Sequence, residues 1–143
     1  MRICDLIKCQ ETYFAEMGQT VLESVRAMVE RNIGAVPVLH NGKLVGIFSE
    51  RDLMKRVVSE GRDPRRTCLA EVMTPEPLSI GMNEDLEQCM ALMRRYGFRH
   101  LPVCHEGQLV GIVSLRDILL HDLTEKNDEV RMMRAYMYSV PDA

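Results

Sequence analysis

The fold is decided by the stretch AVPVLHNGKLVGIFSERDL at residues 35–53, which returns as HLPVCHEGQLVGIVSLRDI at residues 100–118. Positions 36–53 and 101–118 share 11 of 18 residues at a constant offset of 65, and the two copies align without a gap across 17–58 and 82–123. Self-similarity at a fixed period is the signature of a repeated structural unit. The chain is therefore predicted to contain one unit twice.

Each copy begins with the signals of an amphipathic helix. Thr20 with Glu23, and Asp85 with Gln88, have the spacing of a capping box, which satisfies free backbone N–H groups at a helix start. Apolar residues then follow at helical spacing. The helices are predicted to end at two glycines, Gly34 and Gly97.

Two short strands and a second helix follow in each copy. The first pair of strands, 36–39 and 44–48, is separated by Asn41-Gly42, which favours a tight type I′ hairpin because both residues accept positive φ. Glu106-Gly107 stands at the same turn in the second copy. The second helix begins at Ser49 or Ser114. An extended segment at 78–80 predicts an opening strand, so each unit has the order strand-helix-strand-strand-helix, an α/β (α+β) fold.

These patterns divide the chain into four parts. We expect a first unit at 1–60, a linker at 61–71, a second unit at 72–123, and a C-terminal helix and tail at 124–143. The linker contains three arginines together with Gly61 and Pro64. The last helix is predicted from three apolar residues along one side: Val130, Met133 and Met137.

Composition narrows the possible functions. The 143 residues include 46% apolar and 27% charged side chains with a net charge of −3, which is typical of a folded protein and argues against nucleic-acid binding. No apolar run reaches the roughly 18 residues that a membrane span needs. Asp5 and Lys8 interrupt what would be the apolar region of a signal peptide, and the five cysteines contain no C-x-x-C pair. We therefore expect a cytoplasmic protein with reduced thiols, no metal site, and no contact with a membrane.

The repeated pattern h-P-V-x-x-x-G-x-L-V-G-I-h-S-x-x-D resembles the CBS domain. Met73-Thr74-Pro75 before the second unit also fits that family, and the resemblance extends from about Ile3 to Leu123. The first copy departs from the family at its opening strand, where Cys9-Gln10-Glu11 stands in place of Met-Thr-Pro. The resemblance implies a stand-alone tandem module whose two units pack around a pseudo-twofold axis, with two clefts between them.

Similar modules bind adenosine-containing ligands in these clefts, such as AMP, ADP, ATP, S-adenosylmethionine or NAD. The resemblance therefore implies a regulatory sensor with no catalysis and no required cofactor, which signals to an unidentified protein target when a ligand changes the orientation of its units. Similar modules also pair through apolar helix faces, so a homodimer is expected. The alternative is a structural dimerisation or docking module with vestigial clefts.

The two Ser-x-x-Asp sequences carry the chemistry of such a site. A carboxylate such as Asp52 or Asp117 can accept both hydrogen bonds of the ribose cis-diol, and a helix N-terminus favours a nearby phosphate. The alternative role of each Ser-x-x-Asp is a helix cap. Both roles can hold together, because the serine can cap the helix while the aspartate faces the ligand. Arg51 and Arg116 are candidates for phosphate contacts or are solvated first-turn arginines.

The resemblance further implies that the residues before each buried strand line the cleft that holds the other unit's aspartate. One cleft is then predicted to contain Ile47, Ser49, Arg51, Asp52, Thr74, Leu78, Phe98, Arg99 and His100. The other is predicted to contain Ile33, Gly34, Ala35, Ile112, Ser114, Arg116 and Asp117. We expect the first to be the stronger site because Arg99 can bind phosphate, although a salt bridge between Arg99 and a local carboxylate such as Glu106 is the structural alternative.

Overall fold

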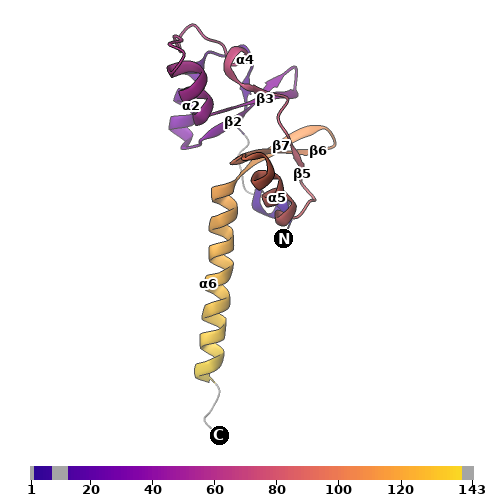
Figure 1. The fold of residues 1–143 in the computed structure, drawn as a ribbon. Coiled ribbons are helices and arrows are strands. Elements are labelled where there is room, and N and C mark those ends of the chain that lie inside the picture. The colour runs from indigo at the N-terminus through magenta and orange to yellow at the C-terminus, as the bar shows by residue number, and fades with distance from the viewer. Residues whose placement is uncertain (1, 8–12, 140–143) are drawn as a thin grey trace.

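The computed structural model describes residues 2–7 and 13–139 and contains two similar α/β units (Figure 1). The first unit has the elements β1 (Ala15–Glu16), α2 (Val21–Arg31), β2 (Ala35–His40), β3 (Lys43–Ser49), α3 (Glu50–Asp52) and the π-helix η1 (Leu53–Val58). The second has β5 (Ile80–Gly81), α5 (Leu86–Tyr96), β6 (His100–His105), β7 (Gln108–Ser114) and α6 (Leu115–Ser139). The predicted order of strand-helix-strand-strand-helix is confirmed in both.

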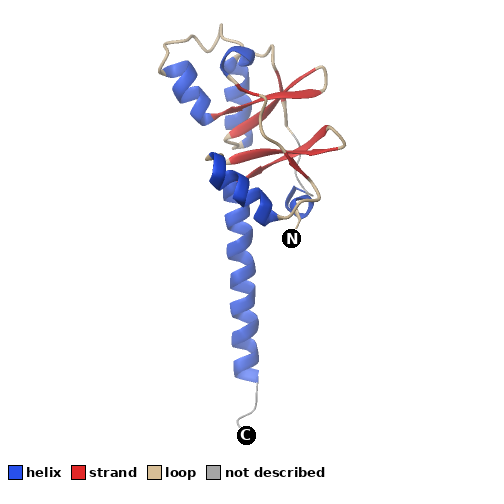
Figure 2. Ribbon diagram, turned by 45° about the vertical axis from the view of Figure 1, so that its right-hand side comes forward, coloured by secondary structure: helices blue, strands red, loops and turns tan. Residues whose placement is uncertain are grey.

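Each unit builds its own sheet, and the sheets are stacked one above the other (Figure 2). The first sheet has the order β1-β2-β3-β4, where β4 is Thr74–Pro75, and the second has the order β5-β6-β7. Strands β3 and β7 contact each other across the interface between the units. This arrangement places the ends of β3 and β7, and the helices that follow them, next to the other unit.

The capping boxes and hairpins form as the sequence predicts. Thr20 Oγ1 accepts from the N–H of Glu23 at 3.2 Å, and Asp85 Oδ1 accepts from the N–H of Gln88 at 2.9 Å. Both turns have two residues with positive φ: Asn41 (51°), Gly42 (79°), Glu106 (50°) and Gly107 (78°).

One predicted helix end is wrong. Gly97 ends α5 with a φ of 72°, as expected, but α2 ends at Arg31 and the left-handed residue after it is Asn32, with a φ of 54°. Asparagine tolerates this conformation better than most residues that have a side chain. Gly34 is therefore free for a different role, which is to leave space beside the other unit.

Each of the two short helices that precede an opening strand packs against the other unit rather than its own. Helix α1 (Ile3–Ile7) places Ile3 and Ile7 in the core of the second unit, where the N–H of Ile3 donates to the carbonyl of Glu84 at 2.8 Å. Helix α4 (Leu69–Val72) packs in the core of the first unit. Residues predicted as linker thus complete the first core, and the N-terminal segment links the two units together.

Strand β4 joins the second unit to the sheet of the first because β3 leaves it space. Thr74 lies opposite Ile47 in this pairing. A side chain at Gly46 would place its Cβ 3.0 Å from the carbonyl oxygen of Thr74, so only glycine fits there. The predicted strand at 78–80 begins later, as β5 at Ile80, and Cys9-Gln10-Glu11 lies outside the described residues.

Helix α6 differs from the prediction in its length. A separate helix was expected after Leu123, but α6 runs without interruption from Leu115 to Ser139 and extends well beyond the rest of the molecule (Figures 1 and 2). None of the described helices is both long enough and apolar enough to span a membrane.

Candidate functional site

Two cavities lie at the interface between the units, one at each Ser-x-x-Asp sequence. We call them the Asp52 cleft, with a volume of about 660 Å³, and the Asp117 cleft, with a volume of about 1140 Å³. Each combines a helix start from one unit with the residues before the buried strand of the other. The two clefts meet at four residues that line both of them: Gly34, Glu50, Arg99 and His100.

The carboxylate of Asp52 is buried and already bonded on both oxygens. Its Oδ2 accepts from the N–H of Ser49 at 3.0 Å and from the hydroxyl of Ser49 at 3.2 Å. Its Oδ1 accepts from the hydroxyl of Thr74 at 3.1 Å and lies 3.7 Å from Nε of Arg56. A carboxylate has about four acceptor positions. Asp52 therefore has little capacity left for a ligand in this state.

Arg56 and Lys55 make the wall of the Asp52 cleft cationic. Arg56 is held in place because it also donates to the carbonyl oxygen of Met73 at 2.6 Å. In all, four cationic side chains and two carboxylates line this cleft: Arg51, Lys55, Arg56 and Arg99 with Glu50 and Asp52. The excess of two positive charges favours an anionic ligand.

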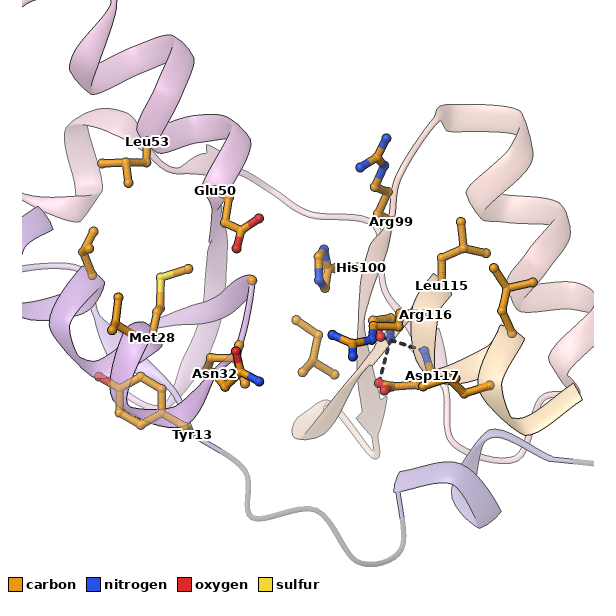
Figure 3. A pocket seen from close by; sticks show the side chains of 18 of the residues that line it. Tyr13, Met28, Asn32, Glu50, Leu53, Arg99, His100, Leu115, Arg116 and Asp117 are labelled. Carbon is orange, nitrogen blue, oxygen red and sulfur yellow. Dashed lines mark hydrogen bonds between the residues drawn. The ribbon is translucent and has the colours of Figure 1, made fainter. Parts of the chain in front are cut away.

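The carboxylate of Asp117 is more accessible. Its Oδ2 accepts from the N–H of Ser114 at 3.4 Å, and the N–H of Asp117 donates to Ser114 Oγ at 3.0 Å, so the serine caps the helix. Among the described residues, Asp117 has no ion pair within 4.0 Å. In Figure 3 its side chain lies beside Arg116, on the wall of the Asp117 cleft that faces the first unit.

Apolar side chains form much of the remaining wall of the Asp117 cleft. Ile33 and Met28 come from the first unit, and Ile112 comes from β7. Leucines of α6 complete the wall at its outer end: Leu119, Leu120 and Leu123. Charged groups in this cleft are two arginines and two carboxylates, so it has no cationic excess.

His100 stands at the junction of the clefts, opposite Glu50 (Figure 3). A Cβ atom on Gly34 would lie 3.6 Å from Cε1 of His100 and 3.5 Å from Oε1 of Glu50, so both side chains rest against this glycine. Burial lowers the pKa of His100 below its ordinary value, and Arg99 lowers it further, while the carboxylates of Glu50 and Asp117 oppose this shift. An alanine at position 34 would make ordinary van der Waals contacts with both side chains.

The structure brings most of the predicted residues together. The Asp52 cleft contains Ile47, Ser49, Arg51, Asp52, Thr74, Phe98, Arg99 and His100, and the Asp117 cleft contains Ile33, Gly34, Ile112, Ser114, Arg116 and Asp117. Two predicted residues line neither cleft. Ala35 is buried in the first sheet, and Leu78 lies in the loop before β5. No ion pair among the described residues includes Arg99, so the alternative salt bridge to a local carboxylate such as Glu106 is not formed there.

Sequence reasoning missed the charged residues one turn beyond Asp52. Lys55 and Arg56 follow Asp52 by three and four residues, and this spacing places side chains on the same side of a helix. That rule was a usable signal for both of them. Glu50 gave no comparable signal, because its position at the junction depends on the packing of one unit on the other.

The comparisons with known proteins agree with this arrangement. The CBS domain family matches residues 6–59 and 69–123. The CBS domain-containing protein YhcV of Bacillus subtilis (strain 168) is 36% identical over 110 residues, which are 77% of this chain and 78% of that protein. A CBS-domain containing protein of Agrobacterium tumefaciens has a solved structure with a TM-score of 0.79 and 30% identity, covering 85% of this chain and 99% of that one.

Two structures of similar fold were solved with ligands. CBSX2 in complex with AMP has a TM-score of 0.72 and 24% identity, over 87% of this chain and 98% of that one. The CBS domain pair of MJ0100, in complex with 5′-methylthioadenosine and S-adenosyl-L-methionine, has a TM-score of 0.78 and 22% identity over the same shares. At such identities the likeness shows the fold alone. From the two family matches and the relative in Bacillus subtilis, the chain belongs to the CBS domain family and carries two CBS domains in tandem.

Proposed function

We propose that this protein is a regulatory sensor that binds adenosine-containing ligands between its two units and performs no catalysis. The observation that carries the proposal is that each Ser-x-x-Asp helix start faces residues of the other unit across a cleft. The complexes of CBSX2 with AMP and of MJ0100 with 5′-methylthioadenosine and S-adenosyl-L-methionine support this class of ligand.

The Asp117 cleft is the better candidate for the nucleoside part of the ligand. The accessible carboxylate of Asp117 can accept both hydroxyls of a ribose, and the apolar wall that includes Ile33 and Ile112 suits a purine ring. This choice reverses the expectation from sequence, which favoured Asp52. The reason is that Asp52 is occupied by Ser49, Thr74 and Arg56.

The Asp52 cleft is the better candidate for a ligand with several phosphates. Arg51, Lys55 and Arg99 supply positive charge there, and the helix start at Ser49 adds backbone donors. For the ribose to reach Asp52, Arg56 has to release this carboxylate and turn towards the phosphates. We therefore expect ADP or ATP to bind this cleft more tightly than AMP does.

Binding would act through the relative orientation of the units. Arg99 and His100 belong to the second unit while Gly34 and Glu50 belong to the first, and all four line both clefts. A ligand that contacts both walls favours the orientation in which those contacts are best, which is a shift between existing states. We propose that a partner protein in the cytoplasm reads this orientation and that no further cofactor is required.

A thermal-shift panel tests the proposal. The purified protein is heated with adenosine, AMP, ADP, ATP, S-adenosylmethionine or NADH, with GTP as the control nucleotide. A ligand at 100 times its dissociation constant should add about 2.7 kcal/mol of apparent stability. The Asp117→Ala variant should lose most of the response to adenosine at the same concentration. If no adenosine compound stabilises the protein at millimolar concentration, the sensor function is wrong and the alternative of a docking module with vestigial clefts is favoured.

A further inference from the structure

The outer part of α6 is a free-standing amphipathic helix. Every residue from 122 to 137 is exposed, and the whole of α6, with 25 residues, is about 37 Å long at 1.5 Å per residue. Figures 1 and 2 both show that beyond its first turns it extends away from the two units. In proteins most of the stability of a helix comes from packing of its apolar face. The exposed apolar side chains of this segment therefore point to a partner surface.

Of the eight large apolar residues that are exposed on the described part of α6, five follow the spacing of a coiled coil, and Leu120, Met132 and Tyr136 lie off that stripe. Steps of four and three residues alternate along one stripe, at positions 119, 123, 126, 130, 133 and 137. We call this stripe the α6 seam. Five of its six members are apolar and at least 45% exposed: Leu119, Leu123, Val130, Met133 and Met137. The sixth, Lys126, turns its Nζ towards Asp122, 3.3 Å away on the same helix.

The charges beside the seam favour a second copy of the same helix in parallel orientation. Glu129 and Arg134 lie on opposite flanks of the seam, five residues apart. In a parallel pair these flanks meet with an offset of five residues, so that Glu129 of each chain faces Arg134 of the other. An antiparallel pair would instead bring the flank with Asp122 and Glu129 against its own copy, which is repulsive.

We propose that two copies of this chain form a homodimer through a parallel coiled coil of their α6 helices, with the α6 seam at its centre. Leu119 and Leu123 belong to this seam and also line the Asp117 cleft. The dimer would therefore place the partner chain next to that cleft. This inference does not rest on the proposed sensor function, since it uses only the helix, its apolar stripe and its flanking charges.

Two neighbouring methionines provide a matched test. Met133 lies in the seam and is 65% exposed, whereas Met132 lies on the outer side and is 73% exposed. In sedimentation equilibrium, the full chain should have twice the monomer mass of 16.4 kDa. Met133→Glu should raise the dimer dissociation constant by at least about a hundredfold, because it places one charge per chain in the seam. Met132→Glu should leave it unchanged within about threefold.

Charge reversal tests the orientation. Glu129→Arg and Arg134→Glu should each weaken the dimer, and the double variant Glu129→Arg with Arg134→Glu should restore it, because only a parallel pair exchanges these two residues. A mass of 16.4 kDa for the wild-type chain across the micromolar range would overturn the dimer. Equal effects of the two methionine variants would overturn the seam, and failure of the double variant to restore the dimer would overturn the parallel orientation. The thermal-shift response to adenosine compounds is measured separately, and its absence would leave the dimer result as it stands.

Discussion

The Asp52 and Asp117 clefts begin with the same Ser-x-x-Asp sequence, yet the carboxylates are in different states. Asp52 is buried and bonded to Ser49, Thr74 and Arg56. Asp117 is partly exposed, and its hydrogen bonds to other described residues lie within its own helix cap. The duplicated motif therefore fixes where the carboxylate lies, while residues outside the motif decide whether it is available to a ligand.

The residues one turn later explain the difference in charge. At the offset of 65, Leu120 of the second unit stands in the place of Lys55, and His121 stands in the place of Arg56. The helix also continues differently, because Leu53–Val58 is a π-helix and the corresponding part of α6 is a regular α-helix. π-Helical turns are rare and frequently occur at functional sites. The duplication has thus produced one cationic and one apolar cleft.

The largest expected effect is the decrease in the free energy of unfolding caused by Asp52→Ala. Asp52→Ala removes the acceptor of two hydroxyls and one N–H and leaves Arg56 without its carboxylate, which should cost about 3 kcal/mol. Asp117→Ala removes the carboxylate that accepts from the N–H of Ser114 and leaves the serine cap in place, so it should cost at most about 1 kcal/mol. Urea denaturation of the two variants measures both values. Equal losses would mean that the bonds around Asp52 contribute nothing beyond its cap.

The sequence was sufficient for features that depend on near neighbours. The capping boxes at Thr20 and Asp85, and the hairpin at Asn41-Gly42, depend on residues within four positions, and each formed as predicted. The pairing of each Ser-x-x-Asp with the other unit followed from the family resemblance.

Features that depend on distant contacts were missed. Apolar residues at Ile3 and Ile7 fit the core of either unit, so their place in the second core depends on the path of the chain rather than on local pattern. Arg56 could have been expected near Asp52 from spacing alone. Its bond to the carbonyl of Met73, which fixes it there, joins residues 17 positions apart. The continuous α6 could have been predicted, because residues 115–139 contain no glycine or proline that would end a helix. The prediction of a separate helix after Leu123 did not take this into account.

The next largest expected effect is on the affinity of the Asp117 cleft for adenosine. Asp117→Ala should weaken adenosine binding by about thirtyfold, equivalent to about 2 kcal/mol, because the diol loses charge-assisted hydrogen bonds. Ser114→Ala is the matched control, since it removes the cap hydroxyl and keeps the carboxylate. Isothermal titration with adenosine measures both. If Ser114→Ala weakens binding as much as Asp117→Ala does, the carboxylate acts only as part of the helix cap.

A smaller effect tests the cationic wall. Lys55→Leu introduces the residue that stands at the equivalent position of the second unit, and it should weaken ATP binding by about tenfold and AMP binding by less. The reciprocal change Leu120→Lys should increase the preference for ATP over AMP in the Asp117 cleft. Both differences should shrink at high salt, because Lys55 is exposed and salt screens exposed charges. Salt-independent effects would indicate a change of packing instead.

The smallest expected effect is a proton linked to His100, at the junction of the clefts. Burial keeps the pKa of His100 below its ordinary value of 6.5, so the imidazole is neutral in the folded protein at pH 7. As the pH falls below 6.5, the unfolded chain binds a proton that the folded chain resists, and stability should decrease. A bound phosphate near His100 favours the charged imidazolium and raises its pKa. Binding of a phosphate-containing ligand should therefore be coupled to the uptake of less than one proton by His100. Such ligands should bind more tightly at pH 6 than at pH 8. Binding of adenosine should be coupled to no proton uptake.

Titration calorimetry in buffers of different ionisation enthalpy measures the proton uptake, and His100→Asn should abolish it. Uptake that persists in this variant would assign the proton to another group and remove His100 from the phosphate-binding part of the clefts.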